Sequence, residues 1–144
     1  MRTGGVLNLL GRLLLVLSLL LLTPIPFSLY YQDGMTGVFV LSSLVGAVVG
    51  GLLFLLFLPE KELGYRDGFA IVVLSWAALA FVGALPYYFS GQMASFVDCY
   101  FESMSGFTTT GSTILAEVEV LSRSLLFWRA LTHWLGGMGI IVLT

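Results

Sequence analysis

The run from Thr108 to Thr113 reads Thr-Thr-Thr-Gly-Ser-Thr and holds the residues best suited to chemistry in this chain. Main-chain carbonyls and hydroxyl groups are hard oxygen ligands, which suit a weakly held hard cation. Gly111 permits the positive-φ backbone that aims successive carbonyls toward one side. An extracellular turn has much the same composition, so these residues alone leave both interpretations open.

The same region has the spacing of a phosphate-binding loop, in which Gly106 and Gly111 enclose four residues and a Ser-Thr pair follows. That motif requires a lysine where this chain has Ser112, and it must follow a β-strand. Here the positive charge is missing and the preceding residues have a helical pattern. We therefore reject a phosphate site.

Catalysis by a side-chain nucleophile is not indicated either. His133, the single histidine, is predicted on a different element from Ser103, Ser105 and Cys99, whereas a nucleophile needs its base within hydrogen-bond reach. Without a second histidine, we expect His133 to serve packing or one hydrogen bond rather than a metal. The single cysteine also excludes an internal disulfide. We predict that the protein is not an enzyme.

The composition indicates the environment in which these residues must work. The chain has 144 residues, of which 58% are hydrophobic and only 10% charged, and its mean hydropathy is +1.02. Ordinary globular domains have about 25% charged residues. The formal net charge of −2 also lacks the basic footprint of a nucleic-acid-binding protein. We predict an integral membrane protein whose surroundings are lipid, with no nucleic-acid partner.

Four apolar runs are long enough for helices that cross a hydrocarbon core of roughly 30 Å. The first run is too long for a signal peptide and lacks a small-residue cleavage site. The chain stops at Thr144 while still apolar, which favours a partial chain over a natural terminus. The four runs are residues 13–29 (extended on the N-terminal side by 6–10), 37–58, 69–89 and 125–143.

The distribution of basic residues predicts the orientation in the membrane. Basic residues before the first run and between the second and third are Arg2, Arg12, Lys61 and Arg66. The segment 90–123 instead carries four acids and a single arginine at its end. By the positive-inside rule, the N-terminus lies in the cytoplasm and segment 90–123 outside. We therefore expect a multi-pass protein of the cytoplasmic (inner) membrane.

A short helix is predicted directly before the Thr-Gly run. Apolar residues between positions 96 and 106 recur at helical spacing, with Ser95 as N-cap, Asp98 three residues on, and Gly106 as terminator. About 10 to 12 residues cannot span a bilayer, which suggests a re-entrant segment. Its partially negative C-terminal end would point toward the Thr-Gly run. Non-helical backbone at membrane depth must be buried in protein or line a water-filled cavity.

Two long motifs closely resemble the TrkH/KtrB potassium-uptake family, within the Trk/Ktr/HKT superfamily. Residues 101–113 read Phe-Glu-Ser-Met-Ser-Gly-Phe-Thr-Thr-Thr-Gly-Ser-Thr, and residues 133–143 read His-Trp-Leu-Gly-Gly-Met-Gly-Ile-Ile-Val-Leu. Shorter likenesses at 31–34 and 66–69 extend the resemblance over essentially the whole chain. Together the two long motifs are highly specific.

The resemblance implies an all-α integral membrane fold made of four repeats, each with an outer helix, a pore helix, a filter strand and an inner helix. Residues 1–60 would form a leading transmembrane hairpin. Residues 61–144 would form the first repeat, cut off inside its inner helix. We therefore expect three further repeats in a missing remainder of the chain. The family also implies a homodimer and a cytoplasmic nucleotide-binding regulatory ring as partners.

Potassium is the ion that the resemblance implies, bound mainly through backbone carbonyls of Thr109, Thr110, Gly111 and Ser112 in one quarter of a selectivity filter. Uptake would follow the electrochemical gradient or be coupled to protons or sodium. Thr113 stands where a tetrameric potassium channel has a second glycine, so we expect weaker discrimination against sodium. The alternative function is a non-conducting membrane subunit that serves structure or assembly.

Two charged residues are predicted at membrane depth, where ionisable groups are costly and are usually paired or functional. Glu102 lies on the predicted pore helix and Arg129 at the start of the inner helix. We expect them to pair and to brace the filter from behind. Alternatively, Arg129 extends to the outer headgroups.

Three glycines follow on the predicted inner helix, at Gly136, Gly137 and Gly139. Small residues allow neighbouring helix backbones to approach closely. They would also thin the inner helix where it lines an ion pathway, and the two roles are compatible.

Overall fold

The computed structural model describes residues 3–58 and 64–143, and within them every ordered element is a helix. No β-strand occurs in these two ranges. The all-α fold class is therefore confirmed. The elements in chain order are α1 (Thr3–Leu20), α2 (Ile25–Tyr31), α3 (Thr36–Leu56), α4 (Tyr65–Ser90), α5 (Phe96–Phe107), the 3-10 helix η1 (Val118–Val120) and α6 (Arg123–Leu143).

Three segments of the described chain are long and apolar enough to cross a membrane, namely Thr3–Tyr31, Thr36–Leu56 and Tyr65–Ser90. They match the first three predicted spans. The first span is not one continuous helix, because residues 21–24 form a turn between α1 and α2. Pro24 lies at the N-cap of α2, where its missing N–H costs no helical hydrogen bond.

The fourth predicted span is a helix, but it is not among these three. Helix α6 extends from Arg123 to Leu143, close to the predicted 125–143. Its sequence includes Arg123, Arg129 and His133, polar side chains that reduce its apolar character. Membrane crossing by α6 stays a prediction.

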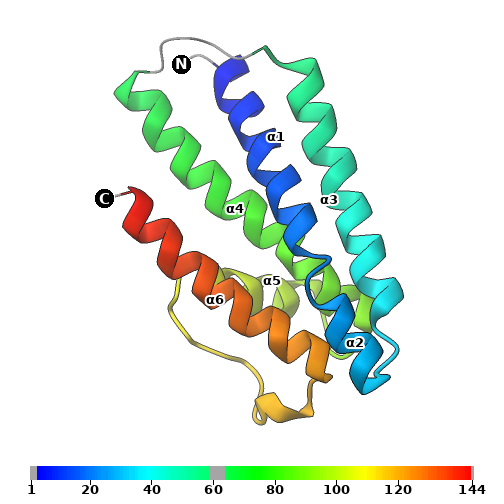
Figure 1. Cartoon of the computed structure of the whole chain (residues 1–144). Helices are drawn as coiled ribbons and strands as arrows, with labels where there is room; N and C mark the ends of the chain where they lie inside the picture. Colours follow the sequence, from blue (N-terminus) through cyan, green and yellow to red (C-terminus); the bar gives the residue numbers. More distant parts are fainter. Residues whose placement is uncertain (1–2, 59–63, 144) are drawn as a thin grey trace.

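Helices α1, α3 and α4 run alongside one another, and α5 and α6 lie toward the end away from the N-terminus (Figure 1). The start of α1 is tied to the end of α3, because the Asn8 side-chain amide donates to the carbonyls of Phe54 (3.0 Å) and Phe57 (2.6 Å). Arg12 lies 5.5 Å from the centre of the Phe54 ring, near the same end. Two other residues of the orientation argument, Arg2 and Lys61, lie outside the described residues, as does the predicted boundary at 60/61.

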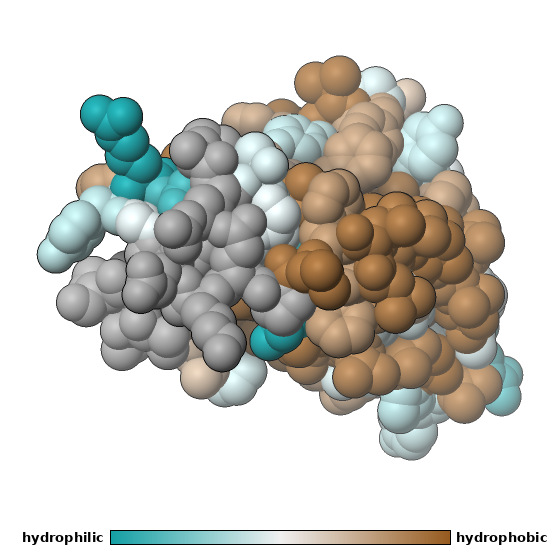
Figure 2. Space-filling model, turned by 90° about the horizontal axis from the view of Figure 1, so that it is seen from above, coloured by the Kyte–Doolittle hydropathy of each residue, from teal (hydrophilic) through white to brown (hydrophobic). Residues whose placement is uncertain are grey.

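The outer surface of the helices is strongly apolar. Large hydrophobic side chains are exposed on α1, α3 and α4, among them Leu19, Leu52, Leu55, Phe69 and Val73. Seen from above, hydrophobic residues cover much of one side of the molecule (Figure 2). Water-soluble monomers rarely expose apolar patches of this extent, so the surface fits a hydrocarbon environment.

The packing of α6 against α4 and α5 makes the part of the core that positions the site. Trp128 and Leu125 of α6 are fully buried, together with Tyr87 of α4 and Cys99 of α5. The Trp128 indole N–H donates to the carbonyl of Gly83 at 3.0 Å. This hydrogen bond gives the buried indole its polar partner and fixes α6 across α4.

Candidate functional site

Helix α5 begins as the sequence predicts. Ser95 has extended backbone dihedrals, and its hydroxyl accepts a hydrogen bond from the Asp98 amide at 3.2 Å. Such an N-cap satisfies one of the free amides of the first turn. The helix has 12 residues and ends at Phe107, so it is too short to span a bilayer.

The predicted role of Gly106 as helix terminator is wrong. Gly106 lies inside α5, one residue before its end, and a Cβ added there would overlap the Thr132 side chain of α6. At the facing position, a Cβ on Gly136 would overlap the carbonyl of Phe107. The two glycines therefore allow α5 and α6 to approach closely. The sequence pattern of a single helix does not reveal such a contact between two helices.

The segment after α5 is not a β-strand, although a filter strand was expected there. Thr109 has φ 57° and Gly111 has φ 74°, both in the left-handed region. Glycine adopts this conformation without cost, whereas a β-branched threonine is an outlier there. Strained backbone of this kind persists only where the surroundings hold it in place, and it clusters at functional sites.

The backbone of this segment divides into bound and unbound groups. The amides of Thr110 and Gly111 donate to the carbonyl of Ser105, at 3.0 and 3.5 Å. Within the described residues, the carbonyls of Thr109, Thr110 and Gly111 accept no hydrogen bond, and all three residues are exposed. Three successive carbonyl oxygens thus have no hydrogen-bond partner among the described residues.

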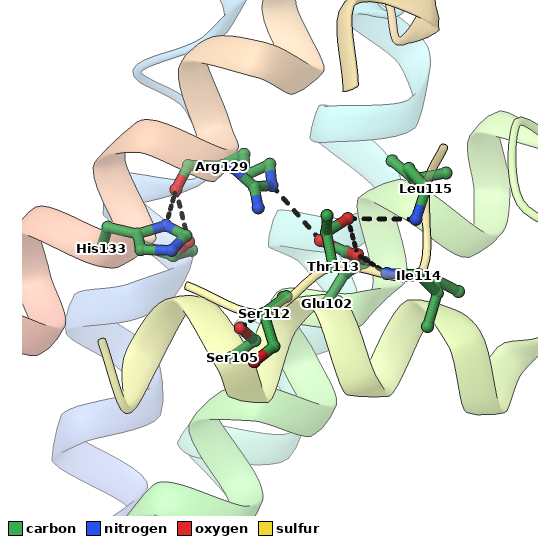
Figure 3. A network of polar contacts seen from close by, with 9 residues as sticks. Glu102, Ser105, Ser112, Thr113, Ile114, Leu115, Arg129 and His133 are labelled. Carbon is green, nitrogen blue, oxygen red and sulfur yellow. Dashed lines mark hydrogen bonds and ion pairs between the residues drawn. The ribbon is translucent and has the colours of Figure 1, made fainter. Parts of the chain in front are cut away.

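The Ser112 carbonyl differs from these three, because it accepts a hydrogen bond of 2.6 Å from the Ser105 hydroxyl. Figure 3 shows this contact beside the neighbouring polar network. The sequence prediction grouped Ser112 with Thr109, Thr110 and Gly111 as equivalent carbonyl ligands. The structure separates it from them by its hydrogen-bond partner.

Glu102 is the centre of the polar network in Figure 3. One carboxylate oxygen accepts hydrogen bonds from the Thr113 hydroxyl and from the Ile114 amide, the latter at 2.8 Å. The other oxygen lies 3.2 Å from Nε of Arg129. The Glu102 side chain is fully buried, whereas that of Arg129 is 18% exposed. A buried carboxylate needs such partners to remain charged.

The structure therefore brings Glu102 and Arg129 together, and it adds contacts that the sequence did not predict. The Thr113 hydroxyl and the Ile114 amide connect the pair directly to the end of the Thr-Gly run. Ser105 was considered only as a nucleophile. Its position three residues after Glu102 puts both side chains on one face of a helix, a signal that was available in the sequence.

The remaining predicted site residues lie on α6. His133 makes one hydrogen bond, between Nδ1 and the Arg129 carbonyl at 2.9 Å, which fits the expected packing role. The three predicted glycines differ in their surroundings. Gly136 lies directly against Phe107. A Cβ added at Gly137 would have its nearest neighbour, an atom of Thr109, at 4.0 Å. A Cβ added at Gly139 would have its nearest neighbour, an atom of Trp76, at 3.5 Å.

A second polar cluster joins the α2–α3 loop to the start of α6. One oxygen of Asp33 accepts from the Ser28 hydroxyl (2.6 Å) and the Met35 amide (3.1 Å). The other accepts from the amide and hydroxyl of Ser124, at 3.1 and 2.6 Å. Burial raises the pKa of Asp33, but these hydrogen bonds outweigh it and hold the pKa below the ordinary value of 3.8.

An apolar cleft of about 360 Å³ lies between α1, α4 and α6, with Leu13, Trp76, Leu135 and Gly139 among its lining residues. Ser75 is the one hydroxyl-bearing residue that lines it. Such a surface offers almost no oxygen ligands to an ion. The cleft is therefore not a second candidate for the cation chemistry of the Thr-Gly run.

The family model of TrkH, described as a cation transport protein, matches residues 36–144. The chain belongs to the TrkH family. The Trk system potassium uptake protein TrkH of Halomonas elongata is 42% identical over 143 residues, which cover 96% of this chain and 29% of that protein. The TrkH protein of Escherichia coli K12 is 40% identical and covers 99% of this chain and 30% of its own length.

The crystal structure of the potassium transporter TrkH from Vibrio parahaemolyticus superposes with a TM-score of 0.93 at 37% identity. The match covers 99% of this chain and 31% of the crystallised chain. The fold of the present TrkH-family chain is thus that of the matching part of a solved family member. The chain spans about 30% of the length of the relatives that it matches.

Proposed function

We propose that this TrkH-family chain contributes one quarter of a potassium-selective filter to a membrane potassium-uptake pathway. The observation that carries the proposal is the set of three unbound carbonyls at Thr109, Thr110 and Gly111. Potassium filters replace the hydration shell of the ion with rings of such carbonyls. One segment cannot close a ring, so the proposal includes three further segments of the same kind outside this chain.

The network behind these carbonyls supports a bracing role for Glu102 and Arg129. Glu102 holds the residues after the filter segment through Thr113 and Ile114, and Arg129 supplies the balancing charge from α6. A carbonyl ring distinguishes ions only if its oxygens keep their positions against thermal motion and ion attraction. The pair thus links the inner helix to the filter without touching the ion.

The wider assignment follows from the family and the charge pattern. We infer a multi-pass protein of the cytoplasmic membrane with a cytoplasmic N-terminus, a leading hairpin in residues 1–60 and a first pore repeat in residues 61–144. A homodimer and a cytoplasmic nucleotide-binding regulatory ring are the partners that belong to this proposal. Uptake driven by the potassium gradient or coupled to another cation fits the same site.

The test is rubidium uptake by the full-length gene product in cells that lack their own potassium uptake. We expect uptake by the wild type and, for Gly111→Ser, a several-fold loss of rubidium-over-sodium discrimination. Gly111 has φ 74° and no atom within 4 Å of an added Cβ, so a side chain there strains the filter backbone without a clash. A left-handed L-residue costs about 1–2 kcal/mol.

Gly34→Ser is the matched control, because Gly34 also has φ 74° and open space around it but lies in the α2–α3 loop. Its discrimination ratio is expected to equal that of the wild type. An unchanged ratio in Gly111→Ser contradicts a filter role for this segment. A wild type that takes up no rubidium favours the alternative, a non-conducting structural or assembly subunit.

A further inference from the structure

Ser105 contacts backbone groups of three successive residues in the proposed filter segment. Its carbonyl accepts from the amides of Thr110 (3.0 Å) and Gly111 (3.5 Å), and its hydroxyl donates to the Ser112 carbonyl at 2.6 Å. The residue is only 5% exposed. Its side chain therefore has a fixed partner and little freedom to exchange that partner for water.

These contacts determine where the carbonyls of the segment point. A peptide unit is planar and trans, so its N–H and C=O groups point in opposite directions. Because the amides of Thr110 and Gly111 face Ser105, the carbonyls of the same peptide units, those of Thr109 and Thr110, face away from α5. The Ser105 hydroxyl instead donates to the Ser112 carbonyl, which therefore faces α5.

We propose that Ser105 is the positioning residue that sorts these carbonyls, presenting those of Thr109 and Thr110 to the ion and keeping that of Ser112 out of its coordination shell. This inference rests on the proposed filter function. Glu102 holds the next two residues from the same face of α5. The Ser105 hydroxyl therefore holds the backbone at the position between the ion-facing carbonyls and the residues that Glu102 binds.

Removal of the hydroxyl releases the Ser112 carbonyl, because no other donor among the described residues contacts it. The peptide unit can then rotate, and a further oxygen competes for the ion in a less regular cage. We expect Ser105→Ala to shift rubidium-over-sodium discrimination toward sodium by about 2- to 12-fold, the factor that the loss of one ordinary hydrogen bond provides.

The chain offers a matched control two residues away on the same helix. Ser103 is fully buried, and its hydroxyl has no hydrogen-bond partner among the described residues. Ser103→Ala removes the same atom from the same helix without releasing a carbonyl. Its discrimination ratio is expected to equal that of the wild type. Ser105→Thr keeps a hydroxyl at the anchoring position and is expected to restore the wild-type ratio.

The measurement is the rubidium and sodium uptake of the full-length protein, with each variant compared at equal amounts in the membrane. A wild-type ratio in Ser105→Ala, in a protein whose wild type takes up rubidium, overturns the inference and leaves the proposed function standing. A wild type without rubidium uptake overturns both. If Ser105→Ala does not accumulate, Ser105→Cys tests the same point, because a thiol is a weak donor of similar size.

Discussion

The α1–α3 hairpin and the proposed filter region (α5 with residues 108–114) are held together by different means. In the hairpin, a Cβ added at Gly11 would lie 2.7 Å from the Gly50 carbonyl, and one added at Gly50 would lie 2.9 Å from the Gly11 carbonyl. The two backbones touch through their smallest residues. In the filter region, side chains of Glu102 and Ser105 supply hydrogen bonds to an irregular backbone.

The difference follows from how each backbone satisfies its polar groups. A helix in lipid makes its hydrogen bonds internally, so close packing of small residues is enough to hold two helices together. The segment from Thr109 to Ile114 has no helical partners for its amides and carbonyls. Its hydrogen-bond partners must therefore come from α5. A single substitution at any of these partners removes support from the segment.

The largest effect is expected from Arg129→Met, which tests whether the filter region depends on charge pairing. The change leaves the fully buried carboxylate of Glu102 without its cation. Removal of one partner from a buried ion pair costs about 3–5 kcal/mol. The measurement is the free energy of unfolding of the purified protein in detergent.

The double variant Glu102→Gln with Arg129→Met is the control for this prediction. It removes both charges and keeps an oxygen that can accept from Thr113 and Ile114. We expect it to be more stable than Arg129→Met alone. An equal loss of unfolding free energy in the two variants shows that Arg129 stabilises the protein through packing. The filter region and the hairpin then differ less than their contacts indicate.

A smaller loss is expected for Asp33→Asn, which tests the link between the hairpin and α6. An asparagine keeps one acceptor oxygen but cannot accept both hydrogen bonds of Ser124 as well as those of Ser28 and Met35. Hydrogen bonds to a charged group contribute about 1.5–3 kcal/mol. Glu117→Gln is the control, since Glu117 is exposed and its carboxylate makes no hydrogen bond within the described residues.

The Asp33 contribution has a defined pH dependence. Its pKa in the folded protein lies below the ordinary 3.8, so the ionised form is the one that folding favours. The stability advantage of the wild type over Asp33→Asn is therefore full above that value and is lost as pH falls below it. Thermal unfolding midpoints measured in detergent from pH 7 to pH 3 test this, and a constant difference over that range contradicts it.

The smallest effect is expected at the contact of α5 with α6, where a glycine allows close backbone packing as in the hairpin. Gly136→Ala drives a methyl group into the carbonyl of Phe107, whereas Gly137→Ala meets its nearest atom at 4.0 Å. Both changes gain the same helix propensity, so the difference between them isolates the clash. We expect Gly136→Ala to be less stable by about 1–3 kcal/mol. Equal unfolding free energies would mean that α5 and α6 separate without cost.

Much of the fold was predictable because hydropathy and length constrain helices in lipid so strongly. The runs at 37–58 and 69–89 correspond to α3 and α4, and the Ser95 cap of α5 is confirmed by its hydrogen bond to Asp98. The turn at residues 21–24 and the interior position of Gly106 were missed. The turn lies at Pro24, a local feature that was present in the sequence. The interior position of Gly106 depends on the packing of α5 against α6, which a pattern along one segment does not encode.

The sequence by itself determined that the chain is a bundle of apolar helices with a short helix and an oxygen-rich segment between two long ones, because the bilayer admits few alternatives. Only the tertiary structure decided which oxygens are bound. Ser105 and Ser112 are seven residues apart, Glu102 and Arg129 are 27 apart, and Asp33 and Ser124 are 91 apart. Such contacts depend on the angle and distance at which helices cross, and these are set by the packing of the whole core.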